Sequence, residues 1–169
     1  MAQWRSHCNQ KLYQARLLLD RLTELEEASD DASNVGMNAV EALTLTSALQ
    51  ESTLFQMVLA YQAYLHEIAE IAQCRDSFMS LDQLLAKTPI ATGEMLEFKK
   101  LEEDSFSWLS QLLYAFQSCG EKDALTSKAA GTQSMIQIQD TTSAALPLRE
   151  WLKQLNDIID LQRNNSQES

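Results

Sequence analysis

The sequence predicts an all-α protein, folded as an up-and-down bundle of four main helices plus one short helix. The chain of 169 residues has only 4 Gly and 2 Pro, too few for the many tight turns of a sandwich or barrel. Apolar residues recur at spacings of three and four along several segments, as on the buried face of a helix. The stretch 38–75 lacks both Gly and Pro, which favours one central helix about 55 Å long. We expect a single domain over residues 1–163 and a frayed tail over 164–169.

The acidic composition limits the classes of partner. The net charge is −11 and the isoelectric point lies near 4.5. Binding of nucleic acid needs clustered Lys and Arg, whereas the 13 basic residues here are scattered, so we expect no nucleic-acid partner. No apolar run reaches about 18 residues, so we expect no membrane span. The first residues lack the pattern of a signal peptide, and we predict a cytoplasmic protein.

The first helix is expected over residues 3–28. Its apolar residues follow one face at helical spacing: Trp4, Cys8, Leu12, Ala15, Leu19, Leu22 and Leu25. Ser, Asp, Asn and Gly gather over residues 29–36, which predicts a loop. The three cysteines (Cys8, Cys74 and Cys119) form no CxxC pair, so they indicate neither a disulfide framework nor a zinc site.

The central helix is expected to begin at Asn38, an N-cap with Glu41 at the capping-box distance. One stripe along it contains Val40, Leu43, Ser47, Leu54, Val58, Tyr61, Leu65, Ile68 and Ala72. Glu51 falls on the same stripe, so it lies at the bundle edge or is buried beside a cation. Lys11 or Arg16 would supply that cation if the first two helices are antiparallel neighbours.

The second half of the chain predicts one short and two longer helices. Ser80 and Gln83 have the capping-box spacing for a short helix that ends before Pro89. A longer helix is expected over residues 94–118, with Gly120 just past its end. Its buried stripe contains Met95, Phe98, Leu101, Trp108, Leu109, Leu112, Leu113 and Phe116. The segment 121–142 has no helical period and predicts a long connection, either a functional loop or a mobile one. The last helix is expected to start near Pro147.

Several short segments carry a resemblance. They are Asn9-Gln10-Lys11-Leu12-Tyr13, the run 48–70, Trp108-Leu109 with Leu112-Leu113, and Arg149-Glu150-Trp151. In these residues the chain resembles a small bacterial family of uncharacterised, all-helical proteins. The resemblance implies an all-helical fold of similar length, and it brings no known activity, cofactor or site residue.

The most concentrated reactive residues are His66-Glu67-x-x-Glu70. A zincin helix would need a second His at the position of Glu70, so the match is incomplete. A mixed metal site of His66, Glu70 and a carboxylate from another helix is one interpretation. Otherwise His66 packs at the bundle edge, and Glu67 and Glu70 face water or a cation. We also consider a buried polar cluster of Lys11, Glu51, His66 and Glu67.

These observations favour a non-enzymatic helical bundle that acts through protein–protein contact, with another protein or as a homodimer. No catalytic residue is assigned, because nucleophile elbows, Walker loops and Rossmann glycine patterns are all absent from the sequence. We assign no cofactor. The alternative is a small-molecule or metal-binding bundle that uses His66, Glu67 and Glu70. A third interpretation, by analogy of fold alone, is a regulatory partner of a nucleotide-handling enzyme.

Overall fold

The computed structural model describes residues 2–30, 39–128 and 146–167, and all its regular structure is helical. Six helices follow one another in this part of the chain: α1 (Ala2–Asp30), α2 (Ala39–Ile71), α3 (Leu81–Lys87), α4 (Gly93–Glu103), α5 (Trp108–Lys128) and α6 (Leu148–Gln167). The predicted all-α class is confirmed. No helix among the described residues is both long and apolar enough to cross a membrane.

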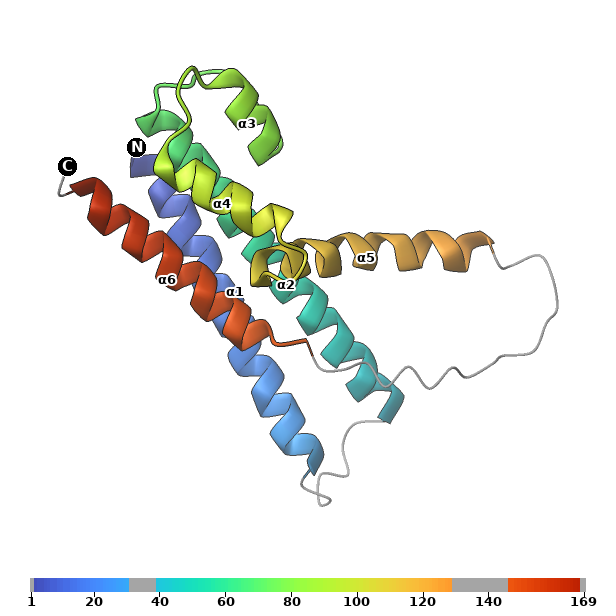
Figure 1. Ribbon diagram of the computed structural model, residues 1–169. Coiled ribbons are helices and arrows are strands. Elements are labelled where there is room, and N and C mark those ends of the chain that lie inside the picture. The colour runs from blue at the N-terminus through green and yellow to red at the C-terminus, as the bar shows by residue number, and fades with distance from the viewer. Residues whose placement is uncertain (1, 31–38, 129–145, 168–169) are drawn as a thin grey trace.

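Helices α1 and α2 form a long antiparallel hairpin, and α6 packs alongside both (Figure 1). Helix α4 lies beside α2, while α5 runs across the bundle and projects from it. The arrangement therefore differs from an up-and-down bundle of four main helices, because one predicted helix is divided into two that point in different directions. Contacts among the helices bury one continuous core, whose largest fully buried side chains include Phe98, Met57 and Leu112.

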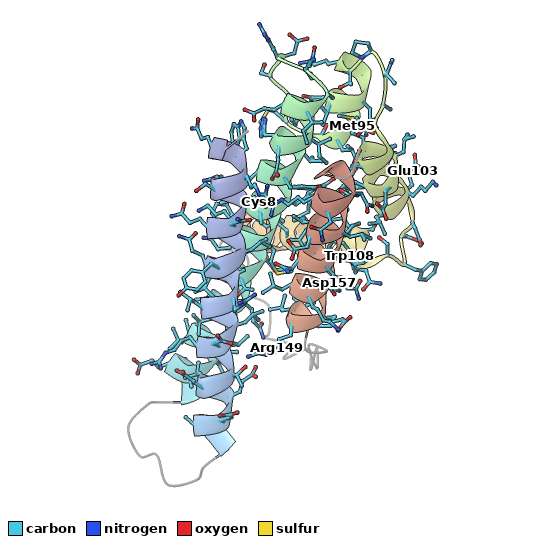
Figure 2. All side chains as sticks on the ribbon, turned by 90° about the vertical axis from the view of Figure 1, so that its left-hand side faces the viewer. Cys8, Met95, Glu103, Trp108, Arg149 and Asp157 are labelled. Atoms are coloured by element: carbon cyan, nitrogen blue, oxygen red, sulfur yellow. The ribbon has the colours of Figure 1, made fainter. Side chains whose placement is uncertain are left out.

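The buried face of α1 agrees with the predicted stripe. Cys8, Leu12, Ala15, Leu19 and Leu22 are all buried, at alternating spacings of four and three. This face packs against α2, and Figure 2 shows Cys8 on the side of α1 that is turned toward the other helices. Spacing alone was sufficient here because the same neighbours cover α1 along most of its length.

The central helix α2 is buried on nearly every side only in its second half, from Thr53 to Ala69. In its first half the predicted stripe is wrong: Val40 and Leu43 are 68% and 71% exposed. Figure 1 shows the reason, because α1 and α2 extend together beyond the end of α6, so α1 is the main neighbour of this part of α2. Asn38, the predicted N-cap, lies outside the described residues.

Helix α2 ends at Ile71, four residues before the predicted end at 75. The N–H of Cys74 donates to the carbonyl of Ala69 at 2.9 Å, and the N–H of Gln73 donates to that of Glu70 at 3.1 Å. This pair of bonds is a Schellman motif, with Gln73 in the left-handed region at φ 58°. Glycine usually occupies such a position, and its absence hid the helix end in the sequence.

The helix predicted over 94–118 is broken between Glu103 and Trp108. The Ser107 hydroxyl donates to the carbonyl of Leu101 and accepts the N–H of Ser110 at 3.0 Å, so Ser107 caps α5. The predicted stripe is nevertheless correct in its most buried members: Met95, Phe98, Leu109 and Leu112. The break preserves the buried face and changes the helix direction.

Two other boundaries also differ from the prediction. Helix α5 continues through Gly120 to Lys128, so the connection expected over 121–142 begins later; residues 129–145 lie outside the described part. Helix α6 continues to Gln167 through most of the segment expected to fray from 164. For α3, the predicted cap is confirmed: the N–H of Gln83 donates to Ser80 Oγ at 3.3 Å.

Candidate functional site

An ion pair between α6 and α2 lies within the bundle. Arg163 Nε donates to Glu67 Oε1 at 3.0 Å, and Arg163 Nη2 donates to Glu67 Oε2 at 2.6 Å. Only 8% of each side chain is exposed. The planar guanidinium matches the two carboxylate oxygens, so both charges are satisfied by one partner. Glu67 therefore faces a cation, which is one of the two environments expected for it.

Helix α1 completes this cluster. Arg163 Nη1 donates to Asn9 Oδ1 at 2.8 Å, and the guanidinium carbon lies 5.5 Å from the centre of the Tyr64 ring. Burial raises the pKa of the neighbouring Cys8 thiol to about 11, although the Arg163 charge opposes this change. A thiol with such a pKa is protonated and poorly nucleophilic at neutral pH. The cluster joins three helices and offers little for nucleophilic catalysis.

His66, next to Glu67 on α2, packs between two aromatic rings. The Trp4 ring is stacked on it with centroids 4.2 Å apart, and the Phe78 ring lies 4.3 Å away on an inclined plane. Burial lowers the pKa of His66, while the charge of Glu70 acts in the opposite direction. The rings connect the start of α1, the end of α2 and the segment before α3. His66 thus packs at one end of the bundle.

The four residues considered as one polar cluster are not brought together. Glu51 is exposed and accepts a 3.4 Å hydrogen bond from Ser47, and it precedes Glu67 by more than four turns, roughly 24 Å along the helix. Lys11 donates to Gln14 at 3.1 Å on α1 instead of reaching Glu51. Glu51 therefore lies at the bundle edge, which is one of the two environments expected for it.

Sequence reasoning missed Arg163 and Asn9. Arg163 continues the stripe of Trp151, Leu155 and Ile159 at steps of four, and a cation on an apolar stripe is a signal for a buried partner. Among the described residues, no group of three or more His, Cys, Asp or Glu side chains is placed to hold a metal ion.

A groove lies where α5 crosses α2, with the start of α3 along one side. Its volume is about 500 Å³, and we call it the α2–α3–α5 groove. Its apolar and aromatic lining consists of Val58, Tyr61, Leu65, Met79, Leu81, Leu113, Tyr114 and Phe116. Met79 and Tyr114 are 86% and 73% exposed. These exposures place large apolar surface in contact with water around the groove.

One carboxylate belongs to the lining of this groove. The hydroxyl of Tyr61 donates to Glu102 Oε1 at 2.8 Å, from α2 to α4. Burial raises the pKa of Glu102, the hydrogen bond from Tyr61 opposes the rise, and Asp82 and Lys99 have smaller, opposite effects. Burial together with the Glu102 charge also raises the pKa of Tyr61, so its hydroxyl keeps the proton that it donates.

Two other grooves are more polar. One, of about 380 Å³, lies between α1 and α6 and contains Arg16, Asp20, Arg149 and Asp157, with charges of both signs. Figure 2 shows Arg149 and Asp157 on α6 in this region. The second, of about 600 Å³, lies between α4 and α6 and includes the exposed Glu97 and Lys100. Neither has the run of aromatic and aliphatic side chains found in the α2–α3–α5 groove.

The chain matches a family of unknown function, DUF6586, over residues 1–169. It belongs to DUF6586. This confirms the expected resemblance to a family without known activity. No curated protein and no solved structure matches the chain. Within this DUF6586 protein, the buried Arg163–Glu67 pair joins helices, whereas the α2–α3–α5 groove presents apolar surface to solvent.

Proposed function

We propose that this protein is a non-enzymatic helical bundle that acts through protein–protein contact, and that the α2–α3–α5 groove is the contact surface. The observation that carries the proposal is the exposure of Met79 and Tyr114 beside a groove with an apolar lining. Large exposed apolar patches on soluble proteins are typical of binding surfaces. Aromatic residues and Met are also enriched where proteins bind one another.

The crossing of α5 over α2 supports the choice of this surface. Phe55 and Phe116 stack with ring centroids 6.2 Å apart, and Phe55 remains 47% exposed. Phe116 also lines the groove, so the apolar surface continues from the groove to Phe55. A partner that covered this surface would remove several aromatic side chains from water, which favours association.

The partner is another protein or a second copy of this chain. We propose a cytoplasmic location for the protein. We expect no nucleic-acid partner, because its net charge of −11 repels phosphate. The alternative, a metal or small molecule bound by His66, Glu67 and Glu70, takes second place. Glu67 already engages Arg163 through both oxygens, and His66 already packs between two rings.

Site-specific photocrosslinking in the protein's own cells tests the proposal. Benzoylphenylalanine replaces Tyr114 in the groove or, as a matched control, Tyr13 on α1, which is 58% exposed. We expect a discrete adduct from position 114 and none of the same mass from position 13. Its mass distinguishes a second copy from another protein, and the complex should form again from purified components. Equal adducts at both positions, or no adduct from position 114, would refute the proposal.

A further inference from the structure

Glu102 is a carboxylate without a cation of its own among the described residues. It is half-buried beside the groove, and it accepts a hydrogen bond from the neutral Tyr61 hydroxyl. Lys99, three residues earlier, bonds instead to Asp82 at 2.7 Å and to Glu103 at 3.3 Å. A half-buried carboxylate gains more from a cation than an exposed one does, because water screens the attraction less.

The groove has the charge pattern of a receptor for a cation with an apolar body. Among the described residues that line it, none is Lys, Arg or His, and Glu102 is the one with a formal charge. Leu113, Phe116 and Met79 provide the apolar contacts. An occupant that places a positive group on Glu102 and apolar groups along the remaining lining would complement both features.

A second copy of the chain is disfavoured as the occupant by its charge. None of the six described helices contains more Lys and Arg than Asp and Glu, and the whole chain carries −11. Two copies of a chain that each carry −11 repel one another, which opposes their association. A different protein with a basic helix meets no such repulsion.

We propose that the α2–α3–α5 groove binds a basic amphipathic helix of a partner protein, with a Lys or Arg of that helix on Glu102. This proposal rests on the proposed function, since it specifies the partner of the same surface. The apolar face of the helix packs on the groove lining, with anchors three and four positions apart. Its basic residues provide charge steering toward an acidic protein and the specific contact at Glu102.

Peptide binding tests the proposal with defined probes. The first probe is a Leu/Lys peptide of about 18 residues, roughly 27 Å as a helix, with one apolar and one basic face. The second has the same composition in scrambled order, and the third has Glu in place of Lys. Dissociation constants are measured by isothermal titration calorimetry. We expect the first probe to bind more tightly than the other two.

The deciding comparison is between E102Q and E103Q. Both variants remove one negative charge, but Glu103 has 64% of its side chain exposed and bonds to Lys99. We expect E102Q to weaken binding of the first probe about tenfold and E103Q to weaken it less than about twofold. Equal losses in the two variants, or equal binding of the scrambled peptide, would overturn the proposal. Circular dichroism establishes that both variants remain folded.

The two proposals fail differently. If crosslinking at position 114 captures a partner whose affinity E102Q does not change, the basic-helix proposal is wrong and protein–protein contact at the groove stands. If the adduct is a second copy of this chain, the basic helix of another protein is likewise overturned. If position 114 gives no adduct of its own, the contact surface itself is wrong.

Discussion

Arg163 on α6 and Glu67 on α2 form a buried ion pair between residues 96 positions apart in the chain. Burial alone would lower the pKa of Arg163, but the hydrogen bond and the charge of Glu67 raise it. A pair of this kind stabilises only while both members are present, because either charge left alone inside the bundle lacks the hydration it would have in water.

We therefore expect Glu67→Ala to lower the free energy of unfolding by about 3–5 kcal/mol. The reason is that the Arg163 charge would lose its partner while remaining buried. Urea denaturation followed by circular dichroism measures the change. Arg149→Ala is the matched control, since 58% of that side chain is exposed, and its loss should be below about 1 kcal/mol.

The double variant Glu67→Leu with Arg163→Met checks the cause. It removes both charges and keeps apolar volume, so it should recover most of the stability that Glu67→Ala loses. A double variant no more stable than Glu67→Ala would mean that the lost stability arises from packing rather than from an unpaired charge.

The elements of the fold could be predicted where local spacing decides them. The buried stripe of α1 and the Ser80 cap of α3 depend on neighbouring residues, so the sequence alone predicts both. Which parts of α2 other helices cover depends on how the helices pack together. Val40 and Leu54 share one predicted stripe, yet they are 68% and 1% exposed. The break at Ser107 preserved the apolar period, so periodicity could not reveal it.

In the candidate sites, too, the sequence predicts residues on one helix but not their partners on other helices. The sequence singled out His66 and Glu67, and both lie at contacts between elements, but it could not supply Arg163 or Asn9, which come from other helices. The groove depends on the direction that α5 takes after the break at Ser107. Because that direction was not predictable, neither was the meeting of Tyr61, Glu102 and Tyr114 around one groove.

The end of α2 gives a second prediction. Gln73 has a φ of 58°, where a Cβ atom is unfavourable, whereas glycine adopts this conformation freely. We expect Gln73→Gly to raise the free energy of unfolding by about 0.5–1 kcal/mol. Gln62→Gly, inside α2, should instead lower it by about 1 kcal/mol. A decrease for Gln73→Gly would show that its side chain contributes more than the backbone strain costs.

The environment of His66 predicts a dependence of stability on pH. Burial holds its pKa below the ordinary value of 6.5, so the unfolded chain binds the proton more readily than the folded chain. The stability that neutral His66 contributes is present above pH 6.5 and decreases as the pH falls below it. His66→Phe keeps an aromatic ring between Trp4 and Phe78 but cannot titrate.

We therefore expect His66→Phe to lose less stability than the wild type between about pH 8 and about pH 5. Urea denaturation at each pH measures the difference, and the carboxylates shared by both proteins contribute equally to both curves. Parallel losses in the two proteins would show that protonation of His66 does not oppose folding.

The hydrogen bond between Tyr61 and Glu102 provides the last prediction. The Tyr61 hydroxyl stabilises the charged carboxylate and so limits the rise that burial causes in the pKa of Glu102. Tyr61→Phe removes this donor and keeps the ring, so the pKa of Glu102 should rise further. The free energy of unfolding should fall by about 1 kcal/mol. Carbon-detected nuclear magnetic resonance of the side-chain carboxyl groups follows the titration directly.

Tyr114→Phe is the control, because Tyr114 lines the same groove while its hydroxyl makes no hydrogen bond to Glu102. If the two variants change the Glu102 titration equally, the effect comes from the polarity of the groove rather than from one hydroxyl. A rise specific to Tyr61→Phe would show that the Tyr61 hydroxyl favours the charged form of Glu102, which is the form that a basic partner helix requires.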